Sequence, residues 1–174
     1  MAQRVYRDLV PHPPLERPDD IGQSFVIGRL RFVLTDTRSH RRPATDGSGT
    51  LLGAAQEAWL IDEARAARSA GQLLVWVSPT PWIGTASPSS DTWAGFAEER
   101  RRVADALVVA GLDDVVMLAG DAHMVAIDDG THSDYTTAGG GGFPVAHGSA
   151  LDRRGSVKGA PTAKGRSPEV ASSV

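Results

Sequence analysis

Short apolar runs alternate with longer segments of helical periodicity between residues 30 and 120. The apolar runs are rich in Val and Leu and end at turn residues, as buried strands do; they span residues 30–36, 73–78 and 114–119. The segments 53–70 and 96–110 carry apolar residues at helical spacing, and a glycine follows each of them. Strands that alternate with helices form a mainly parallel sheet with crossover helices. This order therefore predicts an α/β fold.

Shorter apolar segments flank this alternation. Residues 24–27 run into a Gly28-Arg29 turn that leads to the first strand of the alternation, which is the pattern of a hairpin. Residues 124–127 and 143–146 are expected to be two further short strands. Because a hairpin pairs its strands antiparallel, we expect the complete sheet to be mixed.

The two ends of the chain differ in composition from its middle. Residues 1–22 hold four prolines among charged residues, which predicts an extended lead-in and no helix. Residues 152–174 consist mainly of Gly, Ser, Pro, Lys and Arg with little apolar content, which predicts a flexible tail. The part between them, residues 23–151, is long enough for one folded domain with a core.

Composition excludes several classes of function. The chain has no cysteine, so disulfides, cysteine-bound zinc and thiol nucleophiles are absent. The formal net charge of -3 gives no nucleic-acid-binding signature. No apolar stretch reaches the roughly 20 residues of a membrane helix, and the first residues lack the apolar core of a signal peptide. Localisation and oligomeric state are left open by these observations.

A carboxylate and an imidazole directly follow the third expected strand, in the sequence Gly120-Asp121-Ala122-His123. Open α/β sheets bind ligands at such carboxyl ends of strands. Oxygen and neutral imidazole donors suit Mg, Mn, Ca, Fe or Zn. Alternate residues of an extended strand face opposite sides, so Asp121 and His123 share a metal only if the chain bends, which Gly120 permits. The alternative is a turn with a capping Asp and a surface His.

A second polar pair, Asp36 and Arg38, follows the first strand of the alternation. A carboxylate and a guanidinium at the end of a strand can orient a phosphate or a metal-bound water, because arginine binds phosphate through two parallel hydrogen bonds. We therefore take both as candidate catalytic residues. The alternative is a local ion pair that closes the loop.

The segment 79–93 is a long loop with three prolines. Loops of this length without regular structure are often functional. Trp82 and Trp93 lie in it, and aromatic residues in such a loop either line a pocket or, more often, pack the loop down. Asp91 or Thr92 is the expected N-terminal cap of the helix that follows.

Other polar residues of the second half have weaker signals. Glu99 or Arg100 is expected on the solvated face of the helix 96–110. His132 and His147 follow the Gly-Asp-x-His motif in the chain and are able to approach the same cleft. Each of them alone is more often a surface histidine or a satisfied core histidine than a ligand.

Taken together and in order, four segments resemble the PhoD-like (alkaline phosphatase D) metallophosphoesterases. The segments are residues 32–39 (FVLTDTRS), 52–60 (LGAAQEAWL), 91–100 (DTWAGFAEER) and 118–123 (LAGDAH). The resemblance covers roughly residues 20 to 155, and the order and approximate spacing of the four segments carry it.

The resemblance implies a calcineurin-like metallophosphoesterase sandwich, in which two mixed β-sheets pack together and are flanked by helices. It implies a hydrolase that cleaves phosphate mono- or diesters through a metal-activated water, with iron and calcium, or with manganese or zinc, as cofactors. Asp121 and His123 match the last metal-binding motif of the family and are expected to be ligands. Asp36 and Arg38 match an Asp-x-Arg segment near its cleft. Family members are often exported through the twin-arginine route.

The resemblance begins after the first metal-binding motifs of the family. Those motifs lie in an N-terminal half and supply the bridging carboxylate of a two-metal site, and residues 1–22 offer no candidate for it. We therefore expect this chain to correspond to the C-terminal half of the catalytic domain, to bind metal weakly and to be poorly active alone. The alternatives are an inactive fragment that acts only as a folded interaction module, and a doubly wound binding domain unrelated to phosphate.

Overall fold

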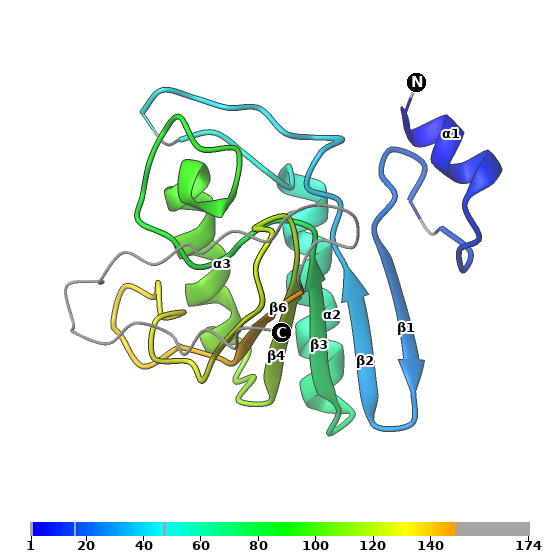
Figure 1. The fold of residues 1–174 in the computed structure, drawn as a ribbon. Coiled ribbons are helices and arrows are strands. Elements are labelled where there is room, and N and C mark those ends of the chain that lie inside the picture. Colours follow the sequence, from blue (N-terminus) through cyan, green and yellow to red (C-terminus); the bar gives the residue numbers. More distant parts are fainter. Residues whose placement is uncertain (1, 16, 47, 149–174) are drawn as a thin grey trace, which may run out of the picture.

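The strands form a mixed sheet in the order β1-β2-β3-β4-β6-β5 (Figure 1). The structure is a computed structural model that describes residues 2–15, 17–46 and 48–148, so the expected tail 152–174 lies outside the described residues. The strands are β1 (Gln23–Ile27), β2 (Leu30–Leu34), β3 (Leu73–Ser78), β4 (Val115–Ala119), β5 (Ala126–Asp128) and β6 (Val145–His147). Strands β2, β3, β4 and β6 are parallel, and β1 and β5 are antiparallel edge strands. The predicted α/β fold with a mixed, mainly parallel sheet is confirmed, and the described residues form one sheet.

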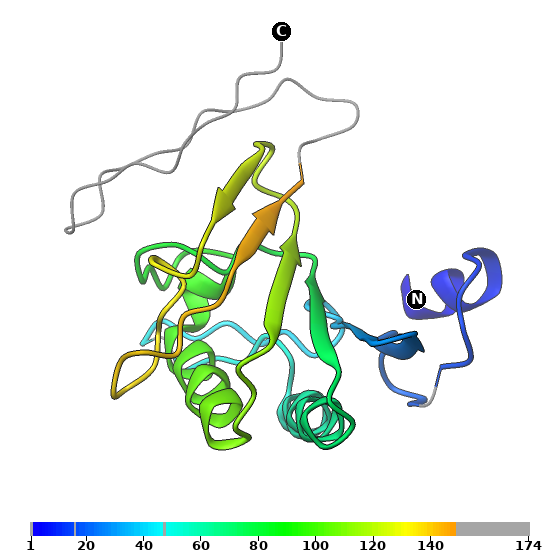
Figure 2. The same cartoon turned by 90° about the horizontal axis from the view of Figure 1, so that it is seen from below.

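Two long helices cover one face of this sheet. Helix α2 (Ala54–Ser69) connects β2 to β3, and the short 3₁₀ helix η1 (Trp93–Phe96) with α3 (Ala97–Val109) connects β3 to β4. Figure 2 shows α2 and α3 on the same side of the strands. Gly71 and Gly111 follow the helices with φ of 61° and 65°, which glycine adopts freely. None of the helices in the described part of the chain combines the length and the apolar character that crossing a membrane requires.

The lead-in contains a helix that the sequence analysis did not predict. Helix α1 (Ala2–Leu9) ends before Pro11, so the prolines that favour an extended lead-in do not interrupt it. The Arg7 guanidinium donates to the carbonyl of Arg17 at 2.6 Å, which ties the helix to the segment before β1. The expectation that the segment 1–22 is extended and contains no helix is therefore wrong for residues 2–9.

Three buried tryptophans lie at the centre of the core between the sheet and its helices. Trp76 of β3 lies edge-on to Trp82 and Trp93, with ring centroids 5.2 and 5.7 Å away. The N–H groups of Trp76, Trp82 and Trp93 donate, respectively, to Thr35 Oγ1 (3.1 Å), the Ser133 carbonyl (2.9 Å) and Ser78 Oγ (3.1 Å). The two loop tryptophans therefore pack the segment 79–93 against the core.

Glu99 and Arg100 are both buried, so the expectation that one or the other lies on a solvated helix face is wrong. The Glu99 carboxylate accepts hydrogen bonds from Thr50 Oγ1 at 2.6 Å and from the N–H groups of Leu51 and Leu52 at 2.5 and 3.3 Å. Arg100 donates to two carbonyls of the loop that follows β3. The reason is that loops from distant parts of the sequence cover this side of α3, which helical periodicity cannot report.

The sheet face opposite the helices, here called the open face, carries exposed apolar side chains. Leu118, Ala146 and Ile127 are paired in register across β4, β6 and β5, so they share this face. Ile127 is 70% exposed, and Ile27, on the same face near the other edge of the sheet, is 62% exposed. Parallel strands are ordinarily buried on both faces. The open face therefore has the character of a surface that packs against another layer.

Glu99→Ala is expected to destabilise the chain by about 2–4 kcal/mol, because three donors lose their acceptor and a cavity forms. Urea unfolding measures this loss. Glu98→Ala is the matched control, since that side chain is 54% exposed, and it should cost less than about 0.5 kcal/mol. Equal losses in the two variants would contradict the role assigned to Glu99.

Candidate functional site

Both polar pairs that the sequence singles out lie at the edge of the sheet that is formed by the carboxyl ends of its parallel strands. Strands β2 and β4 are parallel neighbours of β3, so their carboxyl ends reach the same edge. Asp36 and Arg38 follow β2 there, and Asp121 and His123 follow β4. The Arg38 guanidinium is 3.8 Å from the Asp121 carboxylate, so the structure brings the two pairs together.

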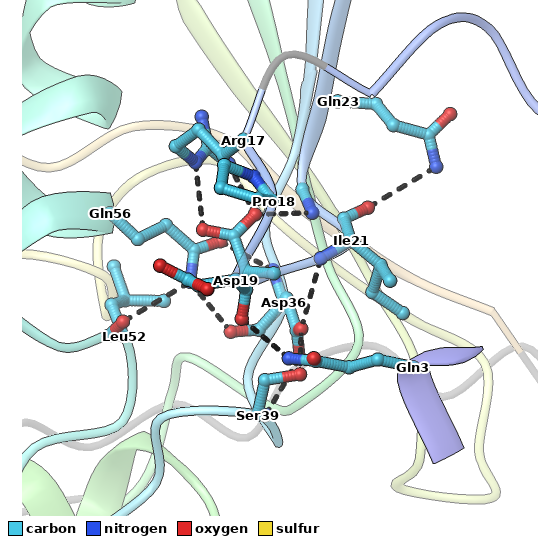
Figure 3. A network of polar contacts seen from close by, with 12 residues as sticks. Gln3, Arg17, Pro18, Asp19, Ile21, Gln23, Asp36, Ser39, Leu52 and Gln56 are labelled. Atoms are coloured by element: carbon cyan, nitrogen blue, oxygen red, sulfur yellow. Dashed lines mark hydrogen bonds and ion pairs between the residues drawn. The ribbon is translucent and has the colours of Figure 1, made fainter. Parts of the chain in front are cut away.

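Asp36 is buried inside the turn that it organises (Figure 3). Its carboxylate accepts hydrogen bonds from the N–H groups of Ile21 (3.3 Å), Arg38 (2.9 Å) and Ser39 (3.0 Å), and from the Ser39 hydroxyl. Its backbone is clamped by Gln56 of α2, which accepts from the Asp36 N–H at 2.6 Å and donates to the Asp36 carbonyl at 2.8 Å. Both carboxylate oxygens are therefore committed to the turn from which Arg38 projects.

The environment keeps this carboxylate ionised. Burial, the largest single effect, raises the pKa of Asp36, but the hydrogen bonds from the Ser39 side chain and from three backbone N–H groups together outweigh it. The net result is a pKa below the usual value of 3.8. A general base at neutral pH needs a pKa near 7, so the geometry and the charge state suit Asp36 for holding the turn.

Arg38 is half exposed and lies between two carboxylates. Its Nη1 is 3.3 Å from Asp91 Oδ2, and its Nη2 is 3.8 Å from Asp121 Oδ2. Asp91 comes from the loop after β3 and was one of the two expected helix caps; Thr92 fills that role, because its Oγ1 accepts the N–H of Ala94 at the start of η1. Asp91 is therefore a residue of this edge that sequence reasoning missed, and its position in a long loop after a strand was the only signal for it.

The backbone of Asp121 and His123 is left-handed, with φ of 72° and 56°. Within the described ranges, these two are the only non-glycine residues with a positive φ. The conformation costs an L-residue roughly 1–2 kcal/mol. The chain bends directly after Gly120, and the left-handed conformations occur at the two candidate ligands themselves. Backbone strain of this kind concentrates at functional sites.

One of the two later histidines reaches this edge. His147 ends β6, pairs in register with Ala119 at the end of β4, and precedes Gly148, whose N–H donates to the Ala119 carbonyl at 2.9 Å. His132 lies beyond β5, which runs in the opposite direction, and its Nδ1 is 2.6 Å from Asp128 Oδ2. The structure therefore places His147 near the candidate site and His132 toward the opposite end of the sheet, where the parallel strands begin.

The described residues do not by themselves make a metal site. In residues 2–15, 17–46 and 48–148, no group of three or more His, Asp or Glu side chains is close enough together to hold an ion. Asp121 and His123 have suitable donor chemistry, but the Asp121 carboxylate lies beside a guanidinium. Stable sites use about four or more ligands, so this edge supplies a partial donor set.

A cavity of about 440 Å³ lies at the N-terminal end of α2. Its lining includes His40, Arg42, Glu57 and Arg102, and the last two form an ion pair at 3.0 Å. None of the four candidate site residues lines this cavity. It is therefore separate from the strand-end site.

These features define an α/β protein whose candidate site lies at the carboxyl ends of parallel strands. Over residues 1–158 the sequence matches the family model of the PhoD-like phosphatases. The chain belongs to the PhoD-like phosphatase family.

Individual relatives agree with this membership. The chain is 30% identical to alkaline phosphatase D of Bacillus subtilis (strain 168), over 68% of this chain and 25% of the relative. A solved structure of PhoD has the same fold with a TM-score of 0.63, at 22% identity, over 86% of this chain and 33% of that one. The chain thus spans about a quarter of the length of the curated relative that it matches.

Asp36→Asn is expected to lower the free energy of unfolding by about 2 kcal/mol at pH 7, because an ionised acceptor of several hydrogen bonds is lost. Since the folded pKa of Asp36 lies below the unfolded value, its contribution is present above about pH 4 and disappears as the pH falls through the folded pKa. Urea unfolding between pH 7 and pH 2 should therefore show the variant and the wild type converging in acid. The exposed Asp62→Asn is the control, and a pH-independent difference for Asp36→Asn would contradict this account.

Proposed function

We propose that this chain is part of a PhoD-like metallophosphoesterase that hydrolyses phosphate mono- or diesters through a metal-activated water. The family is a phosphatase family, and phosphatases of this kind are metal-dependent and act on phosphate esters. The single observation that carries the assignment to this edge is the left-handed backbone at Asp121 and His123. An observed strain directly after a central strand of a parallel sheet supports a functional site there.

In this proposal Asp121 and His123 are two ligands of the metal centre. The carboxylate and the imidazole are donors of the right chemistry for iron, calcium, manganese or zinc. The remaining ligands come from outside the described residues, because the described ones hold no group of three or more His, Asp or Glu side chains close enough together to bind an ion. The chain alone is therefore expected to bind metal weakly and to hydrolyse esters poorly.

Arg38 and Asp36 have different roles in this proposal. Arg38 projects half exposed at the edge and is a suitable donor for phosphate oxygens. Asp36 is a positioning residue, because its carboxylate holds the turn through the N–H groups of Arg38 and Ser39. We further propose that residues 23–151 are the phosphatase portion, and that the described part of the lead-in packs against it through the Ile21 N–H, which donates to the Asp36 carboxylate at 3.3 Å, and the Tyr6 hydroxyl, which accepts from Gln23 Nε2 at 2.7 Å.

The second candidate function is a non-catalytic interaction module. The observation that favours it is the open face, where Ile27 and Ile127 are more than half exposed on a sheet that carries helices on its other side. Exposed apolar side chains on a sheet face are available for packing against another protein surface. Such a module would show no metal-dependent change in stability, because only a ligand that binds the folded state raises it.

Mn²⁺ is expected to raise the melting temperature of the chain, and Asp121→Asn and His123→Ala are each expected to remove most of that rise. Differential scanning fluorimetry at several Mn²⁺ concentrations measures it. Asp129→Asn is the control, since this carboxylate lies beyond β5, away from the candidate edge. The same samples are assayed with a chromogenic phosphate monoester.

Each outcome of this experiment decides one question. A melting temperature and a turnover that do not change in Asp121→Asn and His123→Ala would sink the ligand assignment. Robust turnover that disappears in Asp121→Asn would confirm the ligand and overturn the expectation of poor activity. No effect of Mn²⁺ on any sample would favour the interaction module.

A further inference from the structure

We infer that residues 17–22, here called the strap, are a positioning element of the candidate site, in which the buried Asp20 fixes the turn that carries Arg38. The inference rests on the proposed function for the role of Arg38 as a donor to phosphate oxygens. The strap reaches this site because β1 and β2 are antiparallel, so that Gln23 at the start of β1 pairs with Leu34 at the end of β2. The strap therefore leads into the sheet at the carboxyl ends of the parallel strands.

Asp20 organises the strap from inside. It is 2% exposed, and its carboxylate accepts two hydrogen bonds of 2.7 Å from the Arg17 guanidinium and one of 2.9 Å from the Gly22 N–H. The Arg17 guanidinium also lies over the ring of Trp59 of α2, 3.6 Å from the ring centroid. Removing one partner of a buried ion pair leaves an uncompensated charge. The pair of Asp20 and Arg17 therefore attaches the strap firmly to α2.

The Asp36 carboxylate connects the strap to the turn (Figure 3). Its Oδ2 accepts the Ile21 N–H of the strap at 3.3 Å, and its Oδ1 accepts the N–H groups of Arg38 and Ser39 at 2.9 and 3.0 Å. Ile21 directly follows Asp20, so the hydrogen bonds of Asp20 hold the Ile21 N–H at this carboxylate. One carboxylate thus joins a segment before β1 to the turn after β2.

Gly22 shows how closely the strap is seated. A Cβ at this position would collide with the Arg17 guanidinium and would lie 2.9 Å from Gln56 Oε1. Gln56 is the buried residue of α2 that holds the backbone of Asp36 through its N–H and its carbonyl. The guanidinium of Arg38 has only half-exposed carboxylates as partners, and such pairs are weak. The buried contacts of the strap and of α2 are therefore the ones that fix the turn.

Loss of the strap is expected to loosen this turn. Without the Ile21 N–H, water reaches the Asp36 carboxylate and competes for it with the two N–H groups of the turn. A displacement of about 1 Å at a residue that contacts substrate lowers a rate by up to about 100-fold. The strap would thereby determine how well Arg38 meets a phosphate group.

The test is amide hydrogen exchange of the full chain, followed residue by residue by NMR. Asp20→Asn is expected to accelerate the exchange of the Arg38 and Ser39 N–H groups at least about tenfold, because the turn then opens more readily. Asp19→Asn is the matched control, since its neighbouring side chain is exposed, and it should leave both rates unchanged.

A second variant tests the seating of the strap without a change of charge. Gly22→Ala is expected to accelerate the same two N–H groups by a similar factor, because its Cβ displaces Arg17 or Gln56. Gly84→Ala is its control, since a Cβ there would meet only Ala94, at an ordinary 3.5 Å. This variant gives the decision if Asp20→Asn does not fold.

Two further comparisons separate positioning from a general loss of stability. Leu107→Ala removes a buried side chain near the far end of α3; it destabilises the core and should leave exchange at Arg38 unchanged. In an Asp36→Asn background, Asp20→Asn should add less than about a twofold effect, because Asp20 acts through the Asp36 carboxylate.

The outcomes are decisive. Selective acceleration in Asp20→Asn or Gly22→Ala that disappears in the Asp36→Asn background supports the inference. Unchanged exchange at Arg38 and Ser39, equal acceleration in Leu107→Ala, or full additivity with Asp36→Asn would each overturn it. None of these measurements uses a metal or an ester, so such a result leaves the proposed function standing. The loss of every Mn²⁺ effect in the experiment above would instead remove the proposed function and leave the strap as a structural clamp.

Discussion

The position of the loop after β3 depends on the hydrogen bonds of two buried indole groups. Trp82 and Trp93 are fully buried, and their N–H groups meet the Ser133 carbonyl and the Ser78 hydroxyl. A buried N–H group without an acceptor costs about 1–3 kcal/mol. The observed arrangement of the loop both buries the two rings and satisfies their donors. Asp91, two residues before Trp93, is placed by that arrangement at the edge where β2 and β4 end.

The end of β4 is constrained from both sides. Ala119 pairs with Ser78 of β3 and with His147 of β6, so the strand continues in register on two sides up to its last residue. The chain must then leave the sheet within a few residues, and it does so through left-handed conformations at Asp121 and His123. Non-glycine residues keep such conformations only where their surroundings enforce them. The strained conformations at the candidate ligands therefore lie where a strand paired on both sides leaves the sheet.

Prediction from the sequence succeeded where the signal is local. The apolar run 73–78 is β3 to the residue, and the run 114–119 is β4 within one residue, because turn residues bound both. It failed where a distant segment decides the environment. Glu99 has the spacing of a solvated helix face, yet three donors from a loop almost fifty residues earlier in the chain surround its carboxylate. For the site, parallel strand order was enough to expect Asp36 and Asp121 at one edge, but neither the pairing of Arg38 nor the left-handed backbone has a local sequence signature.

The exposure of Arg38 and Asp121 determines how firmly the guanidinium holds the carboxylate. A fully buried ion pair would hold a carboxylate firmly, because removing one partner leaves an uncompensated charge that costs about 3–5 kcal/mol. The pair at Asp121 is about half exposed, so water compensates either ion when the two separate. Asp36, which lies nearby, differs from Asp121, because its carboxylate is buried and both of its oxygens accept hydrogen bonds. One carboxylate therefore holds the turn, and the other is held only weakly by its arginine partner.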